Sequence, residues 1–463
     1  LIDEVRVSSV ARSTCWMQTE YNNQNSPDTF YSVGTEQTAI DGHSIVASTN
    51  GYGTISPNGE KIVPDGGSQI YVITPDYGYM INDVLVDGYS ETVTNNEYIF
   101  TNVTGDHTIY VNFSPIEGDF NWSDGTFDYR RAITIDYTKV KSGCQANLYH
   151  YPLLVSIDND GQLKSVSNGG HVADDGGYDI IFKDLSGTAL NHEVEFYDPV
   201  AGTLVAWVRI PSLPTDTDTT IYMYYGNTAI TTPTADPDSV WTGSYAGVWH
   251  LNQTPTNAAA SVLDSTNNRN NGQTYNMETG DLISGKIGPA LQITGGDENI
   301  LVPDHPSLDL TGDITLSAWV NFNGLSASLR KGIVSKRGTS NSNEYGMFLD
   351  SADVPTARIA GGTYAATSAP YINLNSWYYY SIVFDNAGNQ IRYYWNGTQL
   401  GNGVYCDGVP STTVASHLEF ASEGGNNDFL NGRLDEVRVS SIARNACWIE
   451  TEYNNQSAPG TFY

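Results

Sequence analysis

The chain has 463 residues, and 52 Asp and Glu against 21 Lys and Arg give it a formal net charge of −31. This negative charge repels phosphate backbones and anionic lipid headgroups, and no run of about 18 apolar residues is present, so we expect no nucleic-acid partner and no membrane insertion. The 31 Tyr and 45 Gly favour an all-β extracellular protein, because aromatic side chains suit pleated strands and Gly supplies tight turns.

Residues 1–31 repeat residues 433–463 without a gap. Pairing Asp3 with Asp435 sets the offset at 435 − 3 = 432, and 21 of the 31 residue pairs are identical. Self-similarity at a long fixed spacing is the signature of repeated structural units. The sequence therefore predicts a unit of 432 residues, one of a tandem or polymerised series, in which residues 1–31 are the last strand and helix of a preceding unit. The alternative is a two-copy protein truncated at this point by coincidence.

The repeat also predicts where successive units join. The opening run LIDEVRVSS alternates in the manner of a strand and supplies the apolar residues Ile2, Val5 and Val7. We place the inter-unit junction at these three residues and at Tyr31 and Tyr463, which end the two copies. If residues 1–31 close the sheet of another unit, an isolated chain should expose this apolar face and tend to associate.

Residues 35–116 are predicted to form a small β domain. Alternating runs at Gln69–Thr74, Asp83–Val86, Glu97–Phe100 and Thr108–Phe113 are separated by Asn-Gly, Asp-Gly and Gly-Asp turns, as a meander requires. The segments GTISPNG, ITPDYGY, DVLVDG and YIFTNVTGDHTIYVNF resemble the bacterial surface repeat related to internalin B-repeats. That resemblance implies a spacer or stalk module without catalysis.

Residues 120–235 are predicted to form a β-sandwich. The runs FDYRRAITIDY, YPLLVSIDNDG and TTIYMYYGN each alternate on a two-residue period. The series resembles a bacterial and archaeal extracellular domain family of unknown function that commonly precedes a lectin-like domain. This resemblance implies the architecture and leaves the function open.

Within this domain the run HEVEFYD places Glu193 and Glu195 on one face of a strand, about 7 Å apart. Retaining glycosidases hold two carboxyl groups about 5–5.5 Å apart, so a polysaccharide hydrolase is an alternative function. We favour a solvated acidic sheet face instead. The pair lies outside the jelly roll described next, and no Asp lies between the two glutamates.

Residues 243–463 carry AGVWHLN, LSAWVNF, SWYYYSIVFD and GRLDEVRVSS in an order that resembles the laminin G-like, concanavalin A-type jelly roll. Asn396-Gly397, between two alternating runs, indicates a type I′ hairpin. Jelly-roll lectins bind glycans with exposed aromatic side chains, although Trp within a strand is more often a core residue. The candidate residues for stacking on sugar rings are Trp249, Trp319, Trp377 and Trp395.

A C-terminal helix should follow the last strand. Ile442, Ala446, Ile449 and Tyr453 recur at spacings of 4, 3 and 4, which is the period of a helix. We expect Ser440 or Ser441 to cap its N-terminus and the run Asn-Asn-Gln to end it, with the helix packed on the exterior of the sandwich.

The run LDSTNNRNNG resembles the laminin G-like loop that directs Asp and Asn oxygens onto one Ca²⁺. We predict Ca²⁺ as a cofactor, bound by Asp264 and Asn268 with Asp435 or Glu436 from the final strand. Adjacent strand residues face opposite sides, so only one of that acidic pair should reach any one site. The alternative is an Asn-rich turn whose side chains bond only their own backbone.

Cys15, Cys144, Cys406 and Cys447 are the candidates for disulfides, and the sequence does not choose among the three connectivities. Because Cys15 repeats Cys447, one unit contains an odd number of cysteines. One thiol is then free, or one disulfide joins two units, which is a hypothesis for fibre cross-linking. The absence of a C-x-x-C pair argues against a zinc or redox motif of that kind.

These features favour a structural or adhesive extracellular protein of the cell surface, one repeat unit of a fibre or a giant tandem-repeat protein, with neighbouring copies of itself as partners. The alternative is a lectin-like array of carbohydrate-binding modules with glycans as partners, and a polysaccharide hydrolase is the less favoured one. No G-x-S-x-G elbow or H-x-x-x-H pair is present, and we predict that the protein is not an enzyme.

Overall fold

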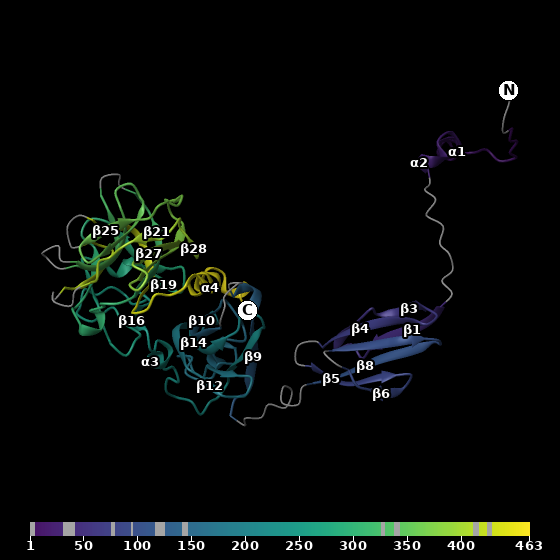
Figure 1. Ribbon diagram of the computed structural model, residues 1–463, viewed down its shortest axis with the longest axis horizontal. Coiled ribbons are helices and arrows are strands. Elements are labelled where there is room, and N and C mark those ends of the chain that lie inside the picture. The colour runs from purple at the N-terminus through teal and green to yellow at the C-terminus, as the bar shows by residue number, and fades with distance from the viewer. Residues whose placement is uncertain are drawn as a thin grey trace. The chain divides into compact units, whose positions relative to one another are not determined.

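The computed structural model describes residues 5–30, 42–75, 79–93, 96–115, 126–140, 147–325, 329–337, 343–410, 416–423 and 428–463 (Figure 1). The chain divides into two compact units, Leu1–Ser123 and Asp124–Tyr463. Strands dominate both units, which confirms the predicted all-β fold with a short C-terminal helix. Each helix in the described residues is too short or too polar to span a membrane.

The first unit contains the helices α1 (Thr14–Asn25) and α2 (Pro27–Phe30) and a small β domain. The strands of this domain are β1 (Gly42–Thr49), β2 (Gly53–Ser56), β3 (Gly59–Pro64), β4 (Gly67–Pro75), β5 (Tyr79–Val86), β6 (Tyr89–Glu91), β7 (Glu97–Val103) and β8 (His107–Pro115). The four alternating runs of the sequence correspond to β4, β5, β7 and β8, so those strand predictions are confirmed.

The β domain packs two sheets, ordered β3-β1-β8-β5-β6 and β2-β4-β7, around one apolar core. The described pairings are antiparallel except for β1 with β8. In β4, Tyr71 and Ile73 are buried while Ile70 and Val72 are exposed, because successive side chains of a strand point to opposite faces. This domain therefore buries a core of its own.

The second unit begins with a sandwich whose sheets are ordered β10-β14-β13 and β12-β11-β15-β9. Its strands are β9 (Tyr129–Ile135), β10 (Leu148–Ile157), β11 (Ile181–Asp184), β12 (Ala189–Leu190), β13 (His192–Asp198), β14 (Thr203–Leu213) and β15 (Thr219–Tyr225), and helix α3 (Pro237–Val240) follows. Residues 204–208 of β14 are all buried. A strand buried on successive positions is covered on both faces, so this sheet has a second packing partner besides its own sandwich.

That partner is a jelly roll of two facing sheets. One sheet is ordered β18-β19-β31-β21-β26-β27-β28, with β16 on β31 and β29 on β27, and the other is ordered β17-β20-β30-β22-β23-β24-β25. The strands are β16 (Tyr245–Trp249), β17 (Gln273–Tyr275), β18 (Leu282–Ser284), β19 (Pro289–Thr294), β20 (Asn299–Val302), β21 (Ile314–Phe322), β22 (Lys331–Arg337), β23 (Asn343–Leu349), β24 (Pro355–Ile359), β25 (Gly362–Ala365), β26 (Trp377–Asp385), β27 (Gln390–Trp395), β28 (Thr398–Gln399), β29 (Val404–Tyr405), β30 (Leu418–Phe420) and β31 (Asn431–Ser440). Short 3₁₀ turns lie at Tyr137–Lys139, Val166–Asn168, Thr279–Asp281, Pro306–Leu308 and Pro459–Thr461.

The hairpin between β27 and β28 has the predicted turn. Trp395 pairs with Thr398, which leaves a two-residue loop. The loop residues Asn396 and Gly397 have φ angles of 49° and 76°, and a type I′ turn requires positive φ at both central residues. The turn prediction is confirmed.

The C-terminal helix α4 (Ala446–Ser457) exists, but its predicted ends were wrong. Asn445 is the N-cap, and its side chain accepts a hydrogen bond from the Trp448 amide. Ser440 belongs to β31 instead, and the helix continues through Asn-Asn-Gln to Ser457. Asn and Ser cap helices about equally well, so strand pairing decided which of them became the cap.

Helix α4 packs between the jelly roll and the preceding sandwich, next to β10 (Figure 1). Trp448 and Ile449 are buried in one apolar cluster with Trp207 of the sandwich and with Trp319 and Tyr379 of the jelly roll. The two sandwiches of the second unit therefore share a continuous core, and α4 closes it.

Candidate functional site

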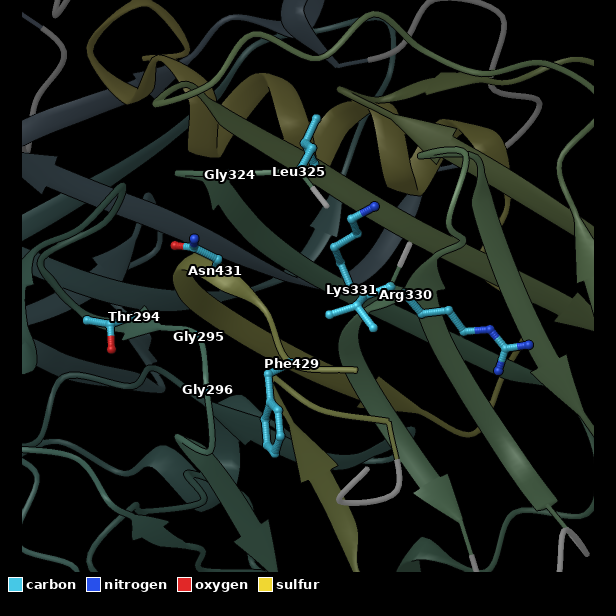
Figure 2. A pocket seen from close by; sticks show the side chains of 10 residues that line it. Thr294, Gly295, Gly296, Gly324, Leu325, Arg330, Lys331, Phe429 and Asn431 are labelled. Atoms are coloured by element: carbon cyan, nitrogen blue, oxygen red, sulfur yellow. The ribbon is translucent and has the colours of Figure 1, made fainter. Parts of the chain in front are cut away.

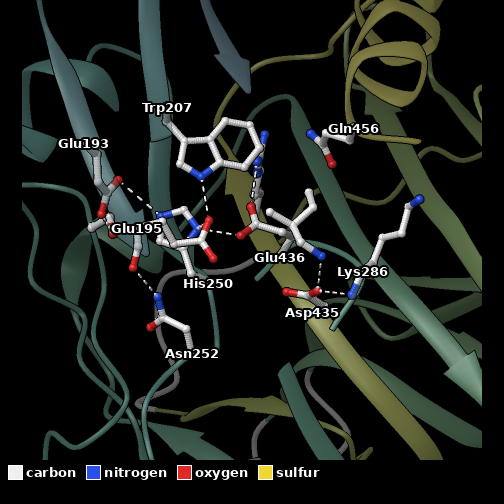
Figure 3. A network of polar contacts seen from close by, with 12 residues as sticks. Glu193, Glu195, Trp207, His250, Asn252, Lys286, Asp435, Glu436 and Gln456 are labelled. Carbon is white, nitrogen blue, oxygen red and sulfur yellow. Dashed lines mark hydrogen bonds and ion pairs between the residues drawn. The ribbon is translucent and has the colours of Figure 1, made fainter. Parts of the chain in front are cut away.

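The joint between these two sandwiches contains a cluster of ionisable side chains. Glu195 lies on β13, Glu436 lies on β31, and His250 directly follows β16 (Figure 3). Their side chains are 0%, 0% and 3% exposed. Buried charged groups must be paired or bind a metal, so the contacts of these three residues define the site.

A β-bulge turns Glu195 into the joint. The pairing of β13 with β14 shifts register between Val194 and Phe196, so Glu195 is the extra residue. Glu193, two residues earlier, is buried as well. The predicted solvated acidic face was therefore wrong, because the jelly roll covers this part of the strand. Neither carboxyl group is open to a polysaccharide chain in this structure.

A second bulge places Asp435 and Glu436 on the same face of β31. Glu436 has a φ of 52°, and the pairing of β31 with β21 shifts register at this point. Leu434 and Val437 on either side both enter the jelly-roll core, while Glu436 contacts the joint and Asp435 accepts hydrogen bonds from the Lys286 and Ile287 amides there. The expectation that these two carboxyl groups face opposite sides was wrong, because a bulge interrupts the alternation of a strand.

His250 lies at the centre of the cluster. Its Nδ1 is 2.5 Å from Glu436 Oε1 and 3.4 Å from Glu195 Oε2, and its Nε2 is 3.2 Å from Glu193 Oε2. Burial lowers the pKa of His250, but the charges of the three glutamates outweigh burial and hold its pKa well above the usual value. Sequence reasoning missed this residue. The available signal was a histidine inside the apolar strand run AGVWHLN, which favours a buried position.

The pKa values of the carboxyl groups in the cluster are shifted in opposite directions. Burial raises the pKa of Glu195 well above its usual value, and the charges of Glu436 and Asp435 add to that effect. Burial, with the charge of Glu436, likewise raises the pKa of Asp435. Burial also disfavours the charged forms of Glu193 and Glu436, but His250 and hydrogen-bond donors lower both pKa values overall. The joint thus contains two carboxyl groups that favour the ionised form beside two that favour the protonated form.

Indole and guanidinium donors fix the glutamates in place. Trp207 Nε1 donates to Glu195 Oε2 at 2.8 Å, and Trp241 Nε1 donates to Glu193 Oε2 at 2.5 Å. Arg438 donates to Glu436 Oε2 at 2.6 Å. The same guanidinium lies 4.3 Å from the ring centre of Trp207, a cation–π arrangement. These contacts connect both sandwiches through one polar network.

Of the residues predicted to bind Ca²⁺, Asp264 and Asn268 are held by hydrogen bonds with their own loop and with β16. Both oxygens of Asp264 accept hydrogen bonds from its own loop and from the Val248 amide, and the amide of Asn268 donates to the Ala246 carbonyl. The bonds to Val248 and Ala246 reach β16, so this loop differs from the alternative of a turn whose side chains bond only their own backbone. Both carboxylate oxygens of Asp264 are engaged, whereas Asn270 Oδ1 of the same loop is buried without a hydrogen-bond partner, and a Ca²⁺ site here stays a prediction.

The tryptophans proposed as sugar platforms are core residues for the most part. Trp249, Trp319 and Trp395 are buried, and Trp377 is partly buried. A buried indole cannot stack on a glycan. The alternative that Trp249, Trp319 and Trp395 stack on sugar rings was therefore wrong.

The cysteines occupy different environments. Cys15 is a free thiol on the surface, and Cys406 is a free thiol in the core. Cys447 is disulfide-bonded, and Cys144 lies outside the described residues. The two copies of the repeat therefore carry the same cysteine in two different chemical states.

The structure describes three of the five predicted junction residues, Val5, Val7 and Tyr463. Val5 and Val7 are exposed, as the sequence predicts, whereas Ile2 and Tyr31 lie outside the described residues. The Tyr463 hydroxyl donates to the Ser156 carbonyl at 3.0 Å and accepts from the Ser156 amide at 2.8 Å. The C-terminal copy of the junction is thus anchored on the first sandwich of its own unit.

A cavity of about 390 Å³ opens at one end of the jelly roll. Thr294 ends β19 and is followed by Gly295 and Gly296, while Phe429 precedes β31 and Asn431 is its first residue (Figure 2). The cavity combines an aromatic ring, an amide and small glycines. This is a mixture that suits a polar ligand with an apolar face.

Comparison with known families agrees with the architecture of the second unit. Residues 294–450 match the concanavalin A-like lectin/glucanases superfamily, and residues 176–277 match a domain of unknown function, DUF2341. The laminin G-like resemblance and the resemblance to a domain of unknown function are thereby confirmed. None of the curated proteins matches the chain.

Several solved structures are similar to this chain at low identity. The binding domain of Paraclostridial Mosquitocidal Protein 1 is 16% identical with a TM-score of 0.36, over 45% of this chain and 52% of that chain. Domain 4 of AbnA, a GH43 extracellular arabinanase from Geobacillus stearothermophilus in complex with arabinotriose, is 17% identical with a TM-score of 0.36, over 46% of this chain and 99% of that chain. The binding domain of Botulinum Neurotoxin DC in complex with SialylT is 12% identical with a TM-score of 0.36, over 46% of this chain and 51% of that chain. The chain thus spans about half the length of the first of these structures.

Proposed function

We propose that this protein is a structural or adhesive extracellular surface protein built from repeated units, in which residues 5–30 complete the jelly roll of a neighbouring unit. The relation between the two copies of the repeat carries the proposal. An offset of 432 maps α1, Thr14–Asn25, onto α4, Ala446–Ser457, with identical bounds (14 + 432 = 446 and 25 + 432 = 457). The same helix therefore forms twice, once buried and once not.

One face of α4 binds both sandwiches. The side chain of Asn455 accepts from the Leu154 amide at 2.7 Å and donates to the Leu154 carbonyl at 3.0 Å. Gln456 accepts from the Trp319 indole at 2.7 Å. Trp448 meets Tyr151 edge-on at 5.3 Å between ring centres. These contacts tie the first sandwich to the jelly roll.

Helix α1 keeps the residues of that face and buries none of them. The residues Trp16, Glu20, Asn23 and Gln24 stand at the positions of Trp448, Glu452, Asn455 and Gln456. Even the ion pair is repeated, because Arg6 pairs with Glu20 as Arg438 pairs with Glu452. The N-terminal copy thus has the side chains needed to bind the surface that α4 binds on the two sandwiches.

The strand that precedes the helix gives the driving force. In the C-terminal copy, Val437 and Val439 lie in the jelly-roll core, whereas their counterparts Val5 and Val7 face solvent. Burying one valine contributes about 1.5–3 kcal/mol. Insertion of residues 5–8 beside β21 of another unit would also satisfy backbone groups that an unpaired segment leaves to water. Residues 42–115 would then act as the spacer that their resemblance to internalin-B-like repeats implies.

The direct test removes the C-terminal copy. A chain of residues 1–432 keeps the N-terminal copy but lacks its own β31 and α4, so we expect the N-terminal segment of one molecule to complete the next. Such a head-to-tail contact produces open filaments, or rings if the rotation between successive units closes. Residues 32–432, which lack both copies, should not form filaments, and residues 1–463 should stay far less associated because each jelly roll is already complete. Negative-stain electron microscopy and analytical ultracentrifugation distinguish these states.

Trp16→Ala in the 1–432 chain supplies the matched variant, and it should shorten or abolish the filaments. If residues 1–432 and 32–432 behave alike, the N-terminal copy has no docking role and the proposal fails. Imaging of the native material should show a regular axial repeat. The free thiol of Cys15 adds a second readout, since it should react with maleimide in the 1–463 chain and be protected within filaments.

Glycan binding is the second candidate function. The cavity near Phe429 and Asn431 favours it, because an aromatic ring and a side-chain amide are the groups that hold one face and one hydroxyl edge of a sugar. A glycan array probed with the full chain, and repeated with Phe429→Ala, tests this role. Binding that survives the substitution would place the glycan elsewhere, and no binding to any glycan would remove this candidate.

A further inference from the structure

We propose that Glu195, His250 and Glu436 bind a divalent cation of the zinc class at the joint between the two sandwiches of the second unit. Among the described residues, these three form a group in which one ligand atom from each lies within 4.8 Å of the others. They come from β13, from the end of β16 and from β31, so the cation would link both sandwiches. The inference is independent of the proposed assembly of units.

The surroundings of His250 are those of a metal ligand. Its Nε2 faces Glu193 at 3.2 Å, which leaves Nδ1 directed at the other two glutamates. Metal-bound histidines usually donate their second ring N–H to a carboxylate in this way, because that bond fixes the ring and raises its basicity. Glu193 is itself held by Trp241 and Ser265. The outer contacts of the histidine are therefore complete.

The two carboxylate ligands are held in a comparable way. Glu195 uses Oε2 to accept from Trp207, and Glu436 uses Oε2 to accept from Arg438. Glu195 Oε1 is buried without a hydrogen-bond partner, and so is Oδ1 of the adjacent Asp435. A buried carboxylate oxygen without a partner costs stability. Figure 3 shows Glu195 and Asp435 on the two sides of Glu436, and of these two residues only Glu195 belongs to the three-residue group.

The charges of the side chains in the joint also favour a bound cation. Glu193, Glu195, Asp435 and Glu436 bring four carboxyl groups into the joint, and Arg438, one of the nearby cations, is shared with Glu452. Buried carboxylates need an opposite charge or a metal. A bound cation would displace the proton from His250 Nδ1 and any proton on Glu195, and these protons would be released to solvent. The cation would also replace the hydrogen bond between His250 Nδ1 and Glu436 Oε1.

The ligand types select the ion. One imidazole nitrogen with two carboxylates suits Zn²⁺, which accepts nitrogen and oxygen ligands in a four-coordinate site. Ca²⁺ needs six to eight oxygens, and the three residues do not supply them. Because the ligands come from both sides of the joint, the cation would hold the two sandwiches together, and its fourth coordination position would need a ligand that these three residues do not supply.

The experiment uses the full chain, stripped with a chelator and then titrated with Zn²⁺, Ca²⁺ or Mg²⁺. We expect elemental mass spectrometry to find one Zn²⁺ per chain. Zn²⁺ should also raise the midpoint temperature of thermal unfolding, and Ca²⁺ or Mg²⁺ should not raise it comparably. Glu195→Gln should abolish stoichiometric binding. Glu193→Gln, which leaves all three ligands in place, should weaken the affinity by about 10–100-fold. Asp297→Asn, an exposed carboxylate of the jelly roll, is the control and should bind as the parent chain does.

The proposal is overturned if the parent chain takes up no stoichiometric Zn²⁺, or if Zn²⁺ and chelator leave its thermal midpoint unchanged. Retention of full affinity in Glu195→Gln would overturn it too. If Glu195→Gln fails to fold, Glu193→Gln still decides, because a purely hydrogen-bonded cluster predicts no Zn²⁺ affinity for that variant to lose.

Discussion

The two copies of the repeat place nearly the same sequence in two environments. Trp448 is 5% exposed and Trp16 is 41% exposed, while Val439 is 0% exposed and Val7 is 97% exposed. The helix forms in both copies, but residues 431–440 form β31 whereas residues 5–13 contain no strand. A helix satisfies its backbone groups within itself and a strand needs a neighbour. The comparison therefore shows that the segment forms its helix without a partner, whereas its strand forms only beside the jelly-roll sheet.

The comparison is tested most strongly at the buried tryptophan. Trp448→Ala should lower the free energy of unfolding by about 3–5 kcal/mol, because it opens a cavity against Tyr151 in the core between the sandwiches. Trp16→Ala in the same 1–463 chain should change it by less than about 0.5 kcal/mol, as surface substitutions do. Urea unfolding of the two variants side by side gives the measurement. Equal losses would mean that the N-terminal copy is packed on its own chain.

A smaller effect is expected at the paired asparagines. Asn455→Ala leaves the amide and carbonyl of Leu154 without the side chain that bonds both. The cost should be about 1–3 kcal/mol, because buried backbone groups lose their partners. Asn23→Ala is the matched change in the exposed copy and should be neutral. Loss of hydrogen-exchange protection at Leu154 in the first variant alone would confirm the contact.

The tyrosine at the end of the chain adds a pH test. Removing the hydroxyl in Tyr463→Phe should cost about 0.5–1.5 kcal/mol near neutral pH, since two bonds to Ser156 are lost. Burial raises the pKa of Tyr463 to about 12, whereas an unfolded tyrosine ionises near about 10. The contribution of the hydroxyl is therefore present below about pH 10 and is lost as the pH rises through the folded value.

Unfolding free energies measured at rising pH should show the advantage of the parent chain over Tyr463→Phe shrinking above about pH 10. Tyr21→Phe, an exposed tyrosine of the other copy, is the control and should give a constant difference. If the difference in unfolding free energy between the parent chain and Tyr463→Phe does not change with pH, folding does not hold the proton on the Tyr463 hydroxyl.

Much of the fold could be predicted, because alternation and turn residues act locally. The strands of the small β domain and the turn at Asn396-Gly397 follow from such patterns. The joint could not be predicted in the same way. Its central bond links His250 to Glu436 across 186 residues, and the bulge that aims Glu436 arises where β31 pairs with the distant strand β21. Period-two reasoning therefore placed Asp435 and Glu436 on opposite faces, and it left the face that Glu193 and Glu195 share exposed to solvent although both contact buried His250.

The smallest effect is expected at the ion pair that both copies share. Arg6 and Glu20 are partly exposed, whereas Arg438 and Glu452 are buried. Exposed pairs contribute about 0.2–1 kcal/mol and are screened by salt, while removing one partner of a buried pair costs about 3–5 kcal/mol. Glu20→Gln in the 1–463 chain should therefore change the unfolding free energy by less than about 1 kcal/mol, and less still at high salt.

The same substitution should matter once the segment is docked. In filaments of residues 1–432, Glu20 would occupy the place of Glu452, so Glu20→Gln should disrupt assembly although it barely affects the free chain. Gln18→Ala, an exposed change in the same helix, should leave assembly intact. An effect of Glu20→Gln that is equally small in both states would mean that docking, if it occurs, does not reproduce the packing of α4. The copies would then be alike in sequence and in helix, but not in the surface they bind.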